Sequence, residues 1–188
     1  NHHTKGLAVM DKSRVHLLKP FTSVMKDVKK PKCKLQSFSF DCFDWNLPDS
    51  YLQHFLRVVK SFSYLNFLKF VIKGIFPNPK VGTLGRLCPG LRSLSLSFNQ
   101  TSIRDTGIEQ LVQGIRCMRS LTQFYVDLIG QRFVSDDGLD LLFGALKEKN
   151  LTFLGLGVGS LQETSSIVEK TVHLLSFLPL EKFYFCMN

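Results

Sequence analysis

The sequence predicts an α/β solenoid, with a curved parallel β-sheet on the concave side and α-helices on the convex side. Three observations predict it. Six short segments share the pattern apolar-x-x-apolar-x-apolar, and their first residues are spaced 26 to 30 residues apart. Helical patterns of apolar residues follow the clearest segments, and an acidic residue stands at the start of those helical patterns. Self-similarity at a nearly fixed period is typical of stacked repeats.

Each patterned segment predicts one short strand. Alternate side chains of a strand point to opposite faces, so the fourth and sixth positions of every segment share the buried face. The six segments are Leu35/Phe38/Phe40, Leu65/Leu68/Phe70, Leu91/Leu94/Leu96, Leu121/Phe124/Val126, Leu151/Leu154/Leu156 and Leu180/Phe183/Phe185.

Helices are predicted after the strands. The pieces 103–107 (IRDTG) and 134–138 (VSDDG) align, and 47–51 and 161–165 are looser versions of them. Apolar residues then recur at i, i+3, i+4 and i+7, which indicates an amphipathic helix. We expect the acidic residues to cap these helices, because a carboxylate accepts the unpaired N–H groups of a first turn. Capping therefore accounts for Asp136 and Asp137, which could otherwise suggest a metal or acid–base pair.

One such unit cannot bury its apolar face alone, but stacked units can. Neighbouring strands lie about 4.8 Å apart, whereas packed helices need roughly 8–10 Å. The mismatch predicts a stack that curves, with its strands on the inner side.

These units resemble the leucine-rich repeat family, and specifically its longer, ribonuclease-inhibitor-like units of about 29 residues. The unit of residues 91–120 matches best and carries Asn99 where the family places its ladder asparagine. The other units depart there, with Phe43, Gly74, Ile129 and Gly159. The resemblance covers residues 35–188. The resemblance implies a leucine-rich-repeat solenoid. It also implies a non-catalytic interaction scaffold, because the family consists mainly of interaction scaffolds.

Gly155, Gly157 and Gly159 raise the possibility of a phosphate-binding loop. Their spacing lacks the glycine offset of a dinucleotide-binding fingerprint, and no Gly-Lys-Ser/Thr follows. In the repeat register Gly155 and Gly157 belong to the fifth strand. We therefore expect them to leave open space on the concave sheet.

Residues 1–34 form a basic segment with nine Lys or Arg against two Asp. We interpret it as a cap on the first apolar edge. Leu7 lies 28 residues before Leu35, which would make this cap a degenerate repeat with a strand at Leu7, and a helix is predicted near residues 20–30. The alternative is a basic patch for an acidic partner such as nucleic acid. Its residues would be Lys26, Lys29, Lys30, Lys32 and Lys34.

The last segment, residues 180–188, supplies a strand with no helix after it. A bare edge strand invites association. We expect further chain, a second copy or another subunit to cover this edge.

Nothing in the sequence assembles an enzyme site, so no catalytic residue, cofactor or metal is assigned. The histidines lack ligand spacing, and no C-x-x-C pair occurs among the five cysteines. We interpret Cys88 and Cys117 as core residues. Reduced thiols favour a reducing intracellular compartment, the cytoplasm or the cytoskeleton. No apolar run approaches the roughly 20 residues of a membrane span.

The concave face is the predicted partner-binding surface, because exposed aromatic residues among small polar ones suit protein recognition. Its candidate residues are Phe67, Lys69, Arg92, Ser95, Gln123, Tyr125, Asp127, Phe153, Lys182 and Tyr184.

The functional hypothesis is a protein–protein interaction scaffold within a larger assembly. Three alternatives remain open: the substrate-recognition part of a ubiquitin-ligase adaptor, a regulator of a small GTPase, and a nucleic-acid- or ribosome-associated protein docking through its basic N-terminus. The GTPase role requires an exposed arginine, and neither Arg92 nor Arg132 can be singled out.

Overall fold

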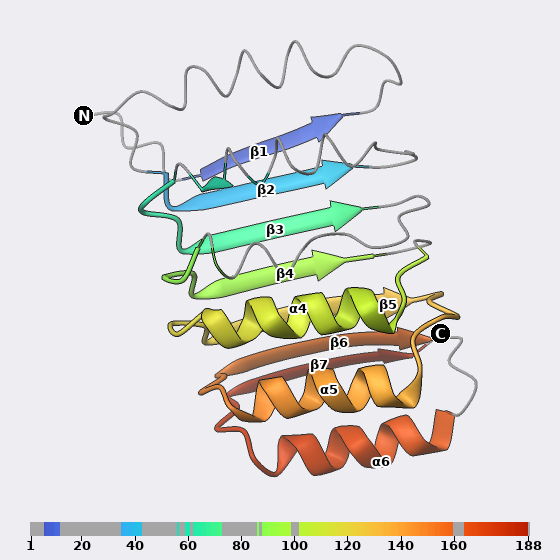
Figure 1. Cartoon of the computed structure of the whole chain (residues 1–188). Helices are drawn as coiled ribbons and strands as arrows, with labels where there is room; N and C mark the ends of the chain where they lie inside the picture. The colour runs from blue at the N-terminus through green and yellow to red at the C-terminus, as the bar shows by residue number, and fades with distance from the viewer. Residues whose placement is uncertain are drawn as a thin grey trace.

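The computed structural model of the chain describes residues 6–11, 35–42, 56, 59–60, 62–72, 86, 88–98, 102–159 and 164–187. Within these residues the protein is α/β, with one seven-stranded sheet and three helices of defined bounds. Every pair of neighbouring strands is parallel, and the strand order in the sheet follows the chain order (Figure 1). The prediction of a parallel sheet with sequential strands is confirmed.

The strands occur at all six predicted segments. They are β2 (Ser37–Cys42), β3 (Phe67–Ile72), β4 (Ser93–Ser97), β5 (Gln123–Ile129), β6 (Phe153–Gly159) and β7 (Lys182–Met187). A further strand, β1 (Gly6–Asp11), pairs with β2 and sets Leu7 opposite Phe38. Part of the basic N-terminal segment therefore belongs to the sheet, as expected for a degenerate repeat.

Three helices follow β4, β5 and β6 and lie on one side of the sheet (Figure 1). They are α4 (Asp105–Cys117), α5 (Asp136–Lys147) and α6 (Thr164–Leu175). The helix expected near residues 20–30 lies outside the described residues. Of the one expected after residues 47–51, the structure describes Leu56 and Val59 as helical, and the N–H of Lys60 donates to the carbonyl of Leu56 at 3.0 Å. No helix in the described part of the chain is both long and apolar enough to span a membrane.

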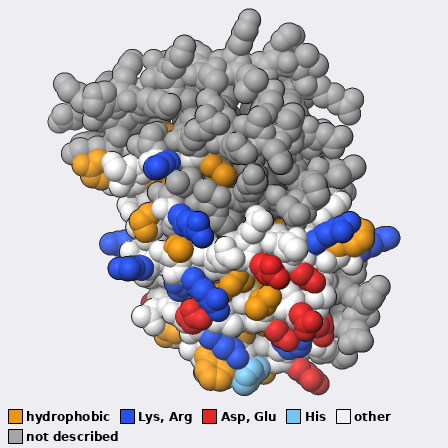
Figure 2. All heavy atoms as spheres, viewed as in Figure 1, with side chains coloured by type: hydrophobic (Ala, Val, Ile, Leu, Met, Phe, Trp, Pro, Cys, Tyr) orange, Lys and Arg blue, Asp and Glu red, His pale blue; other side chains and the backbone are white. Residues whose placement is uncertain are grey.

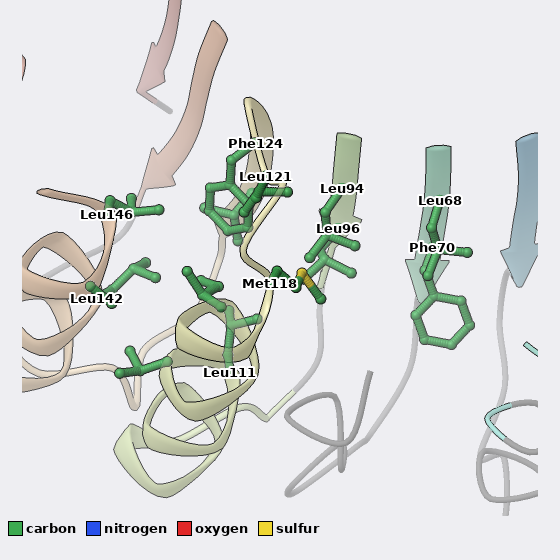
Figure 3. Close-up of a cluster of buried hydrophobic side chains, with 14 of the residues drawn as sticks. Leu68, Phe70, Leu94, Leu96, Leu111, Met118, Leu121, Phe124, Leu142 and Leu146 are labelled. Atoms are coloured by element: carbon green, nitrogen blue, oxygen red, sulfur yellow. The ribbon is translucent and has the colours of Figure 1, made fainter. Parts of the chain in front are cut away.

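The core lies between the strands and the helices (Figure 3). Leu94, Leu96 and Phe124 are at most 1% exposed on the strand side, and Leu111 and Leu142 are equally covered on the helix side. Burying a side chain of this size contributes roughly 1.5–3 kcal/mol. The fourth and sixth positions of the repeat thus form the core, as their spacing predicts.

The core-side residues are more exposed on β7 than on its neighbour β6. Phe183 of β7 is 39% exposed, whereas Leu154, its register partner in β6, is fully buried. The exposure has a simple cause: β7 is the last strand of the described sheet and has β6 as its only neighbour there. Within the described residues, β7 therefore forms one edge of the sheet.

The helix starts differ from the expectation of carboxylate caps. Ser135 caps α5 by accepting a hydrogen bond from the N–H of Gly138, and the residue ahead of α4 is Arg104, without a side-chain cap. The acidic residues bond to the next unit instead. Asp105 accepts a hydrogen bond from the N–H of Ser135, and Asp136 forms an ion pair with Lys170. At α5 the short Ser135 side chain reaches a free N–H, so Asp136 remains available to Lys170; at α4 no side chain caps the helix start.

Gln131 makes a buried connection between units that its sequence pattern did not indicate. Its side-chain amide donates a hydrogen bond to the carbonyl of Phe98, and Gln131 is fully buried. A buried carbonyl left unpaired would destabilise the fold by about 1–3 kcal/mol. Asn99, the expected ladder residue, lies outside the described residues.

The helix side of the molecule is a mixed-charge surface (Figure 2). Lys170 bridges Asp136 and Asp140 across α5 and α6, and Arg116 lies 3.4 Å from Glu148. Exposed pairs of this kind contribute little stability each. Over the described part of this side, the two signs of charge are interspersed.

Candidate binding surface

The strand side chains that point away from the helices form the open face of the sheet. Parallel pairing in register arranges them in rows that run across the strands. The first row is Ser37, Phe67, Ser93, Gln123, Phe153 and Lys182; the second is Ser39, Lys69, Ser95, Tyr125, Gly155 and Tyr184; the third is Asp41, Val71, Ser97, Asp127, Gly157 and Cys186. Residues about 30 positions apart in the chain thereby become neighbours.

A groove of about 640 Å³ runs across the first two rows. Seven of the ten predicted concave-face residues line it: Phe67, Lys69, Ser95, Gln123, Tyr125, Phe153 and Lys182. Tyr184, in the second row, and Asp127, in the third row, are not among its lining residues. Arg92 precedes β4. Ser93, Thr152 and Glu181 complete the polar lining, and they were outside the predicted set.

The side chains that line the groove are smallest on β4. Ser93 and Ser95 form that part of the lining, between the larger Phe67 and Lys69 on β3 and Gln123 and Tyr125 on β5. Hydroxyl and amide groups set among aromatic rings supply both hydrogen bonds and apolar contact, the combination found in binding sites.

Gly155 and Gly157 do not leave open space, contrary to the expectation from sequence. Both are buried. A Cβ atom at Gly155 would collide with the ring of Tyr125, and one at Gly157 would lie 2.8 Å from Oδ1 of Asp127. The β6 glycines therefore provide the room into which Tyr125 and Asp127 lean from β5. Glycine serves here because it lets other groups approach the backbone closely.

The space over Gly155 also brings two tyrosines together. The ring centroids of Tyr125 and Tyr184 are 6.3 Å apart, although β6 separates their strands. Burial, followed by the charge of Asp127, raises the pKa of the Tyr125 phenol. A hydrogen bond with Cys186 comes first among the causes that raise the pKa of Tyr184. Both phenols consequently stay neutral at physiological pH.

The two carboxylates of the third row have different surroundings. Asp41 lies 3.5 Å from the ammonium of Lys69. Asp127 accepts hydrogen bonds from the N–H of Ile129 at 3.0 Å and from the hydroxyl of Ser97 at 3.2 Å. It forms no ion pair with any Lys or Arg in the described ranges. Asp127 is thus oriented by neutral donors, the hydroxyl of Ser97 and the N–H of Ile129.

The cysteines are free thiols where the structure describes them. Cys88 is buried in the core as predicted, and its burial raises its pKa to about 11. Cys117 is exposed, so its assignment to the core was wrong. It is the last residue of α4, and the apolar position behind the strand is filled by the neighbouring Met118.

The predicted basic patch of Lys26, Lys29, Lys30, Lys32 and Lys34 lies outside the described residues. Among the residues that are described, no group of three or more His, Cys, Asp or Glu side chains is arranged to hold a metal ion.

Comparisons with known proteins add no identity. No protein-family model matches the chain, and no relative is found among curated proteins. The open face must therefore be interpreted from its own chemistry.

Proposed function

We propose that the chain is a leucine-rich-repeat solenoid that acts as a non-catalytic protein-binding module, with the groove on the open face as its contact surface. The sequential parallel strands, one per unit of 26 to 30 residues, support the repeat assignment. The single observation that carries the function is the groove itself, where Phe67, Tyr125 and Phe153 stand among small polar side chains.

The composition of the groove favours a protein partner. Aromatic side chains contribute most of the binding energy at protein interfaces, and small hydroxyl groups supply adaptable hydrogen bonds. The length of the groove also suits a peptide partner. Phe67 on β3 and Phe153 on β6 are three strands apart, which is roughly 14 Å at about 4.8 Å per strand. That span corresponds to about four residues of an extended peptide.

The proposed scaffold role includes a larger assembly and a reducing compartment. Free Cys88, Cys117 and Cys186 support the compartment, because oxidising surroundings favour disulfides in secreted proteins. Within the described sheet β7 pairs only with β6, so its outer edge is where further chain, a second copy or another subunit would pair.

The test is a pull-down from the native source with mass-spectrometric identification. Replacing Phe67→Ala together with Phe153→Ala should weaken the genuine partner's binding by tenfold or more, because two central aromatic anchors are lost. The matched control is Phe133→Ala with Leu141→Ala, two exposed apolar residues outside the groove. Proteins retained by the wild type and the control, but not by the groove variant, identify the partner. Equal retention by all three would refute the groove as the contact surface.

A further inference from the structure

The open face carries a second feature beside the groove, the cluster formed by Asp127 and the Tyr125–Tyr184 pair. Asp127 and Tyr125 are two residues apart on β5, and both lean over the β6 glycines. Tyr184 approaches from β7 and is 51% exposed. The cluster therefore has two aromatic rings beside one carboxylate, and one of those rings is open to solvent.

The charge of the cluster is uncompensated within the described part of the chain. The charged and polar neighbours that influence Tyr125 are Asp127, Tyr184 and Cys186, and none of them is a cation. Lys69 is engaged with Asp41 on β2 and β3. Lys182 is in the first row, two rows and two strands away from Asp127, or roughly 16 Å from the spacings of a sheet. A chain with a net charge of +9 thus contains a small negative site on its interaction face.

We propose that this cluster binds an arginine side chain of the protein partner, with its guanidinium against Asp127 and stacked on the tyrosine pair. This inference rests on the proposed function and names the chemistry of one anchor. A guanidinium is planar and weakly hydrated, so it stacks on aromatic faces and donates hydrogen bonds to a carboxylate at the same time. Each oxygen of Asp127 accepts one hydrogen bond internally and has a further lone pair for the ligand.

The site is also held in shape before the ligand arrives. Ser97 and Ile129 orient the carboxylate, and the absence of a Cβ at Gly155 makes room for the Tyr125 ring. Preorganisation of this kind lowers the entropy lost on binding. The glycines on β6 then have a functional consequence, because a side chain at Gly155 would displace one wall of the site.

The experiment uses N-acetyl-arginine-N′-methylamide as the probe and the uncharged citrulline analogue as its isostere. Titrations of the full chain with ring-labelled tyrosine are followed by NMR. We expect the signals of Tyr125 and Tyr184 to shift with arginine, and citrulline to bind at least about tenfold more weakly. Asp127→Asn should weaken arginine binding by about tenfold, since the amide keeps an acceptor but loses the charge. Tyr184→Ala should weaken it as well.

The control variant is Asp41→Asn, which removes a carboxylate of the same row that is already paired with Lys69. It should leave the arginine titration unchanged. Equal shifts with citrulline, unchanged binding by Asp127→Asn, or no shift at all would overturn the arginine site. Failure here leaves the groove pull-down untouched, because that test alters Phe67 and Phe153 only. Failure of the pull-down would equally leave the arginine titration to stand by itself.

Discussion

At the scale of single residues, burial decides the chemistry that each cysteine can show. Cys88 is 7% exposed, and burial raises the pKa of its thiol from 9.0 to about 11. The thiolate is the reactive form, so Cys88 is unreactive near neutral pH. Cys117 ends α4 and is exposed to solvent. One residue type therefore acts as a core group in one unit and as an accessible thiol in the next.

The raised pKa of Cys88 predicts a pH dependence of stability. Unfolded chain loses this proton near pH 9, whereas folded chain keeps it until about pH 11. The contribution to stability is therefore complete below pH 9 and is lost as the pH rises from 9 to 11. Two pKa units correspond to about 2–3 kcal/mol. Urea unfolding at several pH values should show this loss for wild type and not for Cys88→Ala, once their common titrations are subtracted. Parallel pH profiles for the two proteins would contradict the assignment.

At the scale of elements, side chains about 30 residues apart connect successive helices. Asp105 at the start of α4 bonds to the N–H of Ser135 ahead of α5, and Lys170 of α6 bridges to Asp136 and Asp140 of α5. Lys149 donates to the carbonyls of Arg116 and Met118 at the end of α4. Asp105 pairs the N–H ahead of α5 from the preceding unit, and Lys149 pairs the carbonyls that end α4 from the following one, so neighbouring units satisfy each other's helix ends.

Two glycines of α5 provide a matched test of these contacts. A Cβ at Gly144 meets nothing within 4 Å, so Gly144→Ala should raise the free energy of unfolding by about 0.5–1 kcal/mol through helix propensity alone. A Cβ at Gly138 would collide with the Asp105 carboxylate. Gly138→Ala should therefore break the Asp105–Ser135 hydrogen bond and lower the stability by about 1 kcal/mol. Thermal or urea unfolding of the two variants checks the signs, and stabilisation by both would show that the Asp105 contact contributes nothing.

At the scale of the whole molecule, described core-side residues such as Leu68, Leu94 and Leu154 are buried, whereas those of β7 are partly exposed. Phe183 and Met187 of β7 are 39% and 43% exposed, and Val168, Val172 and Phe177 on and just after α6 are exposed beside them in the final unit. An apolar sheet edge with unpaired backbone groups is a site for association. The end of the stack is thus distinct from both the open face and the mixed-charge helix side.

This edge predicts concentration-dependent association of residues 1–188. Light scattering should give a mean mass that rises with protein concentration. Val172→Lys with Met187→Lys should shift it towards the monomer, because both side chains are exposed and the charges repel a second apolar surface. The paired variant should melt close to the wild type. A strictly monomeric wild type at all concentrations would contradict the prediction.

The sequence by itself determined the strands, their order and the inward-facing residues. Leu94 and Phe124 could be assigned to one buried layer because a period of two in each strand and a period near 30 along the chain fix their positions locally. It also identified most of the groove residues, since the positions between the core residues must face outward. Local periodicity is a property of the chain and can be read without coordinates.

The tertiary structure alone decided how neighbouring side chains share space. The sequence suggested emptiness at Gly155 and Gly157, but Tyr125 and Asp127 fill it from the next strand. The sequence suggested carboxylate caps, but Asp105 and Asp136 bond to the following unit. The hydrogen bond from Gln131 to the carbonyl of Phe98 was not predicted. These contacts join residues about 30 positions apart, and their geometry depends on side-chain direction as well as register. The sequence pattern of one unit does not indicate which neighbouring side chain a residue will contact. Only the assembled sheet shows these contacts.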